Sequence, residues 1–303
     1  MSTGRQDTRF PGADGAELTV SSWRADATGL PVLLLHGLSQ QRLFWGPVIS
    51  RLRSAPVASL DQRGHGESDT PADADFSIAA CAADVIACLD ALGWSRAVVA
   101  GHSWGGSVAL RAAATNPERV SAAALIDGGL WSPAGMGPRE EVRARLTPPA
   151  LGLPPEQLWS MIRSSELGRA WSDETEAALA PTFVADDEGR LHSRLGLTRH
   201  LAVLDGLLDT DPAGDLAACE AAQTPLWAAI CDPRRADDGA ADPWNSLKSA
   251  SLRAAAQHSN LIVHRWAGAI HDVPLQWPDL VAGFIDTVVA TARVDGTKAG
   301  GAA

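Results

Sequence analysis

The segment GHSWG at residues 101–105 places a serine between two glycines. A run of small apolar residues precedes this segment and a pattern with helical spacing follows it, so Ser103 is expected where a strand turns into a helix. A G-x-S-x-G segment in that context predicts a nucleophile elbow, whose strained turn exposes the serine hydroxyl beside the positive end of the helix dipole. The alternative is a glycine-rich turn without chemistry. The choice depends on whether a base and oxyanion donors can reach Ser103.

His271 could supply the base. It lies in a short loop between the apolar run at residues 260–268 and a helical pattern that begins at Pro278. An imidazole within hydrogen-bond reach of a serine takes its proton as a general base. A surface histidine is the alternative. Several other histidines are predicted to be structural, namely His102, His192, His200, His258 and His264.

The segment LLLHG at residues 33–37 ends another apolar run and predicts where an oxyanion would bind. Because the chain turns at His36-Gly37, the backbone N–H of Leu38 can point at the serine, and the N–H of Trp104 is the second expected donor. A plain turn is the alternative. The glycines and charges of DQRGHGESD at residues 61–69 predict a structural loop at the edge of the site, with no direct chemistry for Asp61.

These segments share a position at the ends of apolar runs. The runs alternate with helical patterns, which predicts an α/β fold with a mostly parallel central sheet flanked by helices. Ligands of such sheets bind beyond the carboxyl ends of the strands. The apolar runs lie at residues 30–37, 55–64, 96–101, 121–129, 224–232 and 260–268, and a half-exposed strand is expected within residues 14–25. Helical patterns lie at residues 77–92, 243–257 and 278–289.

One region interrupts this alternation. Residues 130–223 show helical and loop-like patterns with six prolines between positions 133 and 155, and no clear buried strand. They are predicted to form a helical cap inserted into a core made of residues 1–129 and 224–292. Residues 293–303 are predicted to be a flexible tail.

Composition and charge exclude several classes of function. The formal net charge is −11, so the chain is not expected to bind nucleic acid, because it has few cations to neutralise phosphates. The most apolar helical stretch, residues 77–92, contains two aspartates, and the N-terminus has no apolar run, so neither a membrane span nor a signal peptide is expected. The four cysteines form no C-x-x-C pair and are expected to be buried free thiols of a cytoplasmic protein.

The order of the motifs resembles that of the alpha/beta-hydrolase fold superfamily. HG at residues 36–37, DQRGHGES at 61–68, GHSWG at 101–105 and a late His271 follow the family's order, and the resemblance covers roughly residues 10–290. The cap matches in position and helical character only. The resemblance implies a serine nucleophile at Ser103, a base at His271 and an acid as third member of a triad.

The resemblance leaves three candidates for the acid. The family places it after one of two strands, more commonly in a Gly-x-x-Asp turn after the strand predicted at residues 225–231. Here Asp232 follows that strand at once, whereas Asp242 has the right spacing but comes after a polar detour. Asp127 occupies the other position, and the two glycines that follow it free the backbone to aim its side chain. Asp127 is the predicted acid, and its task is to orient the imidazole and stabilise its cation.

The resemblance also implies the chemistry. We expect a serine hydrolase that cleaves an ester, lactone or thioester through an acyl-enzyme on Ser103, with no metal and no organic cofactor. A serine at the elbow disfavours the epoxide hydrolases and dehalogenases, which need a carboxylate nucleophile. Alternatives on the same triad are carbon–carbon bond hydrolysis, haloperoxidase-like chemistry or natural-product tailoring. In a different class, the alternative is a non-catalytic small-molecule binder.

Tryptophans near these motifs indicate an apolar, ring-bearing substrate, with ordinary core packing as the alternative. Trp45 follows the predicted oxyanion segment and Trp131 begins the cap. Together with His36 and Gly37, these two residues are predicted to contact the substrate. The expected partner is this small molecule alone, bound by a monomer or a homodimer.

Overall fold

A central sheet in the order β1-β2-β4-β3-β5-β6-β9-β10 contains eight strands of the part of the chain that the structure describes. This computed structural model describes residues 4–53, 56–71, 73–149, 152–232 and 243–299. The strands are β1 (Gln6–Pro11), β2 (Glu17–Trp23), β3 (Val32–Leu35), β4 (Val57–Asp61), β5 (Ala97–His102), β6 (Val120–Ile126), β9 (Leu226–Asp232) and β10 (Leu261–Ala267). β2 is antiparallel to both β1 and β4, and the pairs from β4 to β10 are parallel. The predicted α/β class is confirmed.

Helices cover both faces of the sheet. On one face lie α2 (Ile78–Ala91), α3 (Trp104–Thr115) and α8 (Pro212–Ala221), and on the other lie α1 (Gly46–Ile49) and α11 (Pro278–Ala299). Side chains of a strand alternate between the faces, so Val99 and Val98 of β5 belong to two different apolar clusters, one under each helical layer. This double burial explains why the central strands read as continuous apolar runs.

The edge of the sheet at β1 and β2 differs from the prediction. β1 was not predicted, and β2 is buried at six of its seven residues although its alternating pattern predicted a half-exposed strand. The reason is that its polar face is satisfied inside the protein. The Thr19 hydroxyl donates to the Glu67 carbonyl at 3.2 Å, and the Ser21 hydroxyl donates to the Asp7 carboxylate at 2.5 Å. Burial therefore cannot be read from polarity alone here.

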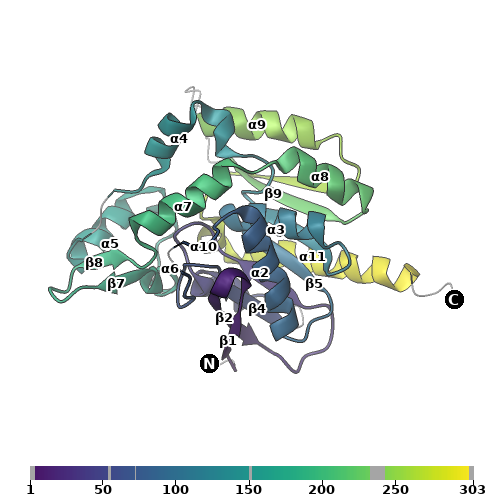
Figure 1. Ribbon diagram of the computed structural model, residues 1–303, viewed down its shortest axis with the longest axis horizontal. Helices are drawn as coiled ribbons and strands as arrows, with labels where there is room; N and C mark the ends of the chain where they lie inside the picture. Colours follow the sequence, from purple (N-terminus) through teal and green to yellow (C-terminus); the bar gives the residue numbers. More distant parts are fainter. Residues whose placement is uncertain (1–3, 54–55, 72, 150–151, 233–242, 300–303) are drawn as a thin grey trace.

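The cap contains α4 (Arg139–Leu146), α5 (Pro155–Ser164), α6 (Asp173–Leu179) and α7 (Gly196–Leu208). Figure 1 shows these helices on one side of the sheet, away from the end of α11. The cap also holds an antiparallel hairpin of β7 (Phe183–Ala185) and β8 (Leu191–Ser193), which was missed because its strands have only three residues each. A turn around Gly189, which has φ +75°, joins the two strands.

Two predicted boundaries differ from the positions of the helices. α8 lies within the sequence predicted as cap, but it packs along α3, and its Leu216 and Cys219 belong to the apolar cluster on that face of the sheet. The helical cap therefore ends at α7. At the other end of the chain, α11 continues to Ala299, beyond residue 293 where a flexible tail was predicted. Among the described residues, no helix combines the length and apolar character that crossing a membrane requires.

Candidate active site

Ser103 lies in the turn between β5 and α3, with a backbone φ of 54° and ψ of −120°. A left-handed φ is uncommon for a residue with a side chain and is typical of a strained functional turn. The two flanking glycines permit it. A Cβ on Gly101 would lie 2.0 Å from the Gly105 carbonyl oxygen, and a Cβ on Gly105 would lie 2.4 Å from the Leu35 carbonyl oxygen. The G-x-S-x-G pattern is thus required by the close crossing of strand and helix.

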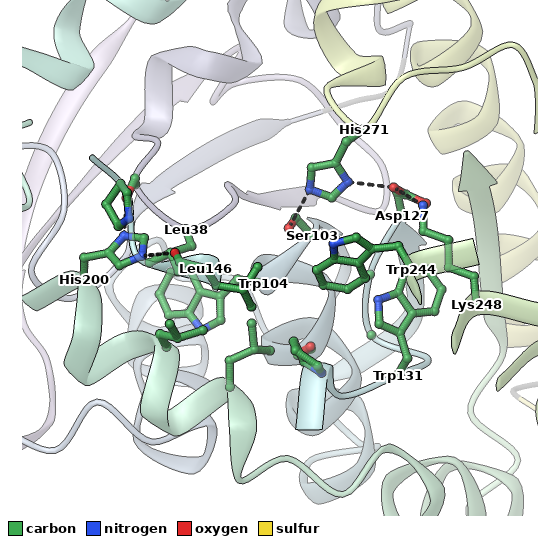
Figure 2. Close-up of a pocket in the computed structure, with 18 of the residues that line it drawn as sticks. Leu38, Ser103, Trp104, Asp127, Trp131, Leu146, His200, Trp244, Lys248 and His271 are labelled. Atoms are coloured by element: carbon green, nitrogen blue, oxygen red, sulfur yellow. Dashed lines mark hydrogen bonds and ion pairs between the residues drawn. The ribbon is translucent and has the colours of Figure 1, made fainter. Parts of the chain in front are cut away.

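The structure brings Ser103, His271 and Asp127 into one hydrogen-bonded chain (Figure 2). His271 lies in the segment between β10 and α10 (Val273–Gln276), and its Nε2 is 2.9 Å from the Ser103 Oγ. Its Nδ1 is 2.6 Å from Oδ2 of Asp127, which follows β6. Because a carboxylate only accepts hydrogen bonds, Nδ1 carries the proton, and Nε2 is left to accept one from the serine. This is the arrangement of a nucleophile, a base and an orienting acid.

The Asp127 side chain is completely buried and has three kinds of donor around it. Besides His271, the Cys231 N–H donates to Oδ1 at 2.9 Å, and the Lys248 ammonium lies 2.8 Å from each carboxylate oxygen. Burial would raise the pKa of Asp127, but the hydrogen bond and charge of His271, followed by those of Lys248, outweigh it and lower the pKa to about 2. Loss of contact with water would lower the pKa of His271, but the hydrogen bond and charge of Asp127 outweigh this effect and raise the pKa.

The other two candidate acids do not occupy this position. Asp232 ends β9, and its carboxylate lies 3.5 Å from the Arg265 guanidinium on the neighbouring strand β10. Asp242 lies outside the described residues. Asp127 is therefore the carboxylate that meets His271, at the position after β6.

Two backbone N–H groups beside Ser103 have no hydrogen-bond acceptor among the described residues. They are those of Leu38, in the loop after β3, and Trp104, the first residue of α3. The N–H groups on either side of Leu38 already donate to side chains, so Leu38 has the available donor of that loop. Both residues line the cavity that contains the Ser103 hydroxyl. A pair of free N–H groups next to a nucleophile is what an oxyanion hole requires.

A cavity of about 570 Å³ lies over Ser103 and His271, within the range of small-molecule sites. Its wall is mainly apolar and comes from both the core and the cap. The apolar members include Leu38, Trp104, Trp131, Pro133, Leu146, Pro148, Leu204, Leu207 and Trp244. Within the described residues, no cluster of three or more histidines, cysteines or carboxylates is arranged to hold a metal ion.

Of the four residues predicted to contact substrate, Trp131 is the one that lines the cavity. Trp45 is fully buried in the apolar cluster of the α11 face, and His36 is also fully buried. The His36 ring is held between the Gly37 carbonyl at 2.8 Å and the Gln62 N–H at 3.1 Å, and burial lowers its pKa to about 4. His36, Gly37 and Trp45 therefore support the site from outside the cavity, and the prediction of substrate contact is corrected for them.

Several cavity residues were not predicted. Ser39 follows Leu38 in the loop after β3, and Glu166 and His200 come from the cap. Trp244 and Lys248 come from α9 (Pro243–Ala255). His200 was predicted to be structural, but its Nδ1 is 2.8 Å from the Ser39 hydroxyl, which links the cap to the core. One signal in the sequence was available for Lys248, since the chain has only one other lysine.

His102, which precedes Ser103, holds the backbone of His271. Its Nε2 donates to the His271 carbonyl at 2.8 Å, and burial, followed by the charge of His271, lowers its pKa to about 4, so the ring is neutral. Next to it, the Gln40 side chain donates to the Asp272 carboxylate at 2.8 Å. Two hydrogen bonds therefore fix the loop that positions His271. The predicted structural role of His102 agrees with this geometry.

The DQRGHGESD segment forms a buried polar loop beside the site. The Asp61 carboxylate accepts the Arg42 N–H at 2.6 Å and the Glu67 N–H at 2.8 Å, and it also pairs with the Arg42 guanidinium. A Cβ on Gly66 would lie 2.1 Å from this carboxylate, which explains a glycine with φ +56° at that position. Asp61 does not line the cavity, in agreement with its predicted structural role.

The sequence model of the alpha/beta hydrolase fold family matches residues 31–152. Among curated proteins, the chain is similar to Lipase LipV of Mycobacterium tuberculosis, with 34% identity over 170 residues that cover 55% of this chain and 62% of the lipase. Among solved structures, it is similar to E-2-(acetamidomethylene)succinate hydrolase, with a TM-score of 0.74, 19% identity and coverage of 94% of this chain and 99% of that one. A thioesterase domain from the curacin biosynthetic pathway has a TM-score of 0.70, 16% identity and coverage of 93% and 99%.

Structural similarity at such low identity shows the fold alone. The chain spans 62% of the length of the lipase and smaller shares of the next two curated relatives, 40% and 28%. The chain therefore has the alpha/beta-hydrolase fold, and its residues 31–152 match the sequence model of that family.

Proposed function

We propose that this protein is a serine hydrolase that cleaves an ester, lactone or thioester through an acyl-enzyme on Ser103. The observation that supports it most is the hydrogen-bonded chain from Ser103 through His271 to Asp127, which opens into the cavity. An activated nucleophile, an orienting acid and an oxyanion site together define acyl transfer as the reaction class.

In the first half of the reaction, the Ser103 Oγ attacks the substrate carbonyl carbon while its proton passes to the His271 Nε2. Asp127 accepts the hydrogen bond of the His271 Nδ1–H and stabilises the imidazolium. The carbonyl oxygen becomes an oxyanion, which the N–H groups of Leu38 and Trp104 hold. Loss of one such donor costs roughly 3 kcal/mol in measured cases. The leaving group departs with the proton from Nε2, and the acyl group stays on the serine.

In the second half, a water molecule attacks the acyl-enzyme and gives a proton to the same His271 Nε2. The tetrahedral intermediate uses the same two N–H donors. Its collapse returns that proton to the Ser103 Oγ and releases the carboxylic acid. All proton transfers use residues of this chain.

The wall of the cavity supports a small, mainly apolar substrate. Trp104, Trp131 and Trp244 line it together with leucines of the cap, so apolar or aromatic groups would be removed from water there. The names of similar proteins, a lipase and a thioesterase domain, agree with ester and thioester chemistry. A volume of about 570 Å³ suits acyl chains of moderate length or a single ring system.

The test is labelling with a fluorophosphonate, followed by turnover of chromogenic esters, lactones and thioesters of graded chain length. We expect the adduct on the peptide that contains Ser103, saturable turnover of at least one class, and loss of both in Ser103→Ala. A wild-type protein that neither labels nor turns over any substrate would contradict the proposal and favour a small-molecule binder. Labelling without hydrolysis of the panel would favour other chemistry on the same triad.

A further inference from the structure

Lys248 contacts the Asp127 carboxylate on a different side from His271 (Figure 2). Its Nζ is 2.8 Å from both carboxylate oxygens and 3.2 Å from the Cys231 carbonyl oxygen. The side chain is 13% exposed, and the carboxylate it faces is fully buried. This pair is therefore protected from the screening that weakens surface ion pairs.

The ammonium group has as many acceptors around it as it has N–H bonds. A lysine has three N–H bonds, and here there are three acceptors, two from Asp127 and one from Cys231. The ammonium also lies 5.4 Å from the centre of the Trp131 ring, and both residues line the cavity. The two contacts with Asp127 thus direct the charge of Lys248 toward the triad acid.

The position of Lys248 has an electrostatic consequence for His271. A buried carboxylate with no other cation would attract the imidazolium strongly, because charges interact more in a water-poor interior. The Lys248 charge opposes this attraction and acts on the pKa of His271 in the lowering direction, whereas Asp127 raises it. The other charged or titratable groups that act on His271 or lie around it are Asp272, His102 and, in the cavity wall, Glu166.

We propose that Lys248 is a positioning residue of this site, which fixes the Asp127 carboxylate and offsets part of its negative charge toward protonated His271. This inference rests on the triad of the proposed function. It also gives α9 a role, because the helix that supplies Trp244 to the cavity wall is tied to the triad acid through Lys248.

The test is a titration of His271 by NMR in protein labelled at histidine, with the His271 signal assigned from its loss in His271→Gln. Lys248→Met keeps the length of the side chain and removes the charge, and Lys248→Arg keeps the charge. Lys298→Met removes the other lysine of the chain, in the last turn of α11, and is the matched control. We expect the His271 midpoint to move to higher pH in Lys248→Met and to stay near the wild-type value in the other two variants.

The acid limb of kcat/KM for an ester substrate is expected to move in the same direction in Lys248→Met. An unchanged or lowered His271 midpoint in a folded Lys248→Met protein would overturn the proposal and leave Lys248 as a packing residue. Lys248→Gln provides a second neutral variant if the methionine variant does not fold. The titration needs no turnover, so a wild-type protein without hydrolase activity would refute the proposed function and still decide the role of Lys248.

Discussion

Protonation at single residues decides whether this site can react. The proposed reaction requires that Asp127 is ionised and that the His271 Nε2 is free to accept the serine proton. Burial works against the first condition, but the partners of Asp127 lower its pKa to about 2, so it is ionised at any pH near neutrality. The same carboxylate raises the pKa of His271, which makes the second condition depend on pH. The residue that strengthens the base therefore also limits the pH range in which the base is free.

Replacement of Asp127 is expected to be far more harmful than replacement of the neighbouring candidate. Asp127→Asn should lower kcat about 10⁴-fold, as for the equivalent change in a measured triad, because the amide no longer selects the right imidazole tautomer. Asp232→Asn changes a carboxylate that lies 3.5 Å from the Arg265 guanidinium and outside the hydrogen-bonded chain of Ser103, His271 and Asp127, so it is the matched control and should keep kcat near the wild-type value. Steady-state kinetics on one ester measures kcat for both variants. A larger loss of kcat in Asp232→Asn than in Asp127→Asn would refute the assignment of Asp127 as the acid.

The pH dependence of kcat/KM has a definite sign. A raised pKa means that His271 stays protonated to higher pH than a free histidine, whose pKa is near 6.5. Because only the neutral imidazole can accept the serine proton, activity should fall on acidification with a midpoint above 6.5. A pH profile on a substrate that does not itself ionise measures this midpoint. A midpoint below that of a free histidine would mean that burial dominates over Asp127.

Among the elements, the crossing of β5, α3 and the end of β6 determines the backbone geometry of Ser103. Three glycines allow backbone to touch backbone there. A Cβ on Gly128 would lie 2.0 Å from the Ser103 carbonyl oxygen, which is as close as the corresponding approach at Gly101. Glycine at these positions removes the steric obstacle to the strained serine conformation. The elbow, the acid and the helix N-terminus are therefore one packed unit.

Gly101→Ala tests whether the close backbone packing of β5 and α3 contributes to stability. The new methyl group would meet the Gly105 backbone, which cannot rotate away, so the free energy of unfolding should fall by about 3 kcal/mol, and activity should fall with it. Gly283→Ala is the control, because nothing lies within 4 Å of a Cβ there and alanine suits the interior of α11. It should raise stability by roughly 0.5–1 kcal/mol. Denaturant unfolding followed by circular dichroism measures both, and equal effects would contradict the packing argument.

At the scale of the whole molecule, the sequence predicted the site residues that lie at strand ends. It could not predict the residues whose position depends on packing between distant parts of the chain. His36-Gly37, Ser103, Asp127 and His271 could be recognised because each follows an apolar run, and the parallel sheet brings such ends together. Lys248 comes from a helix whose docking onto Asp127 leaves no local pattern. Similarly, Trp45 looks like a ligand contact in the sequence, and only the packing of the α11 face shows that it is buried.

The reactivity of the four cysteines can show whether the core unfolds cooperatively. Cys81, Cys88, Cys219 and Cys231 are all buried and free. Burial raises the pKa of each thiol, to about 12 for Cys219 and higher for the others, so very little reactive thiolate forms at neutral pH. These residues lie on α2, α8 and β9, so a thiol reagent should modify all four only after cooperative unfolding and at the same denaturant concentration. Mass spectrometry across a urea series counts the modified thiols. Early modification of Cys231 alone would show that the strand beside Asp127 opens before the rest, and it would contradict a single cooperative core.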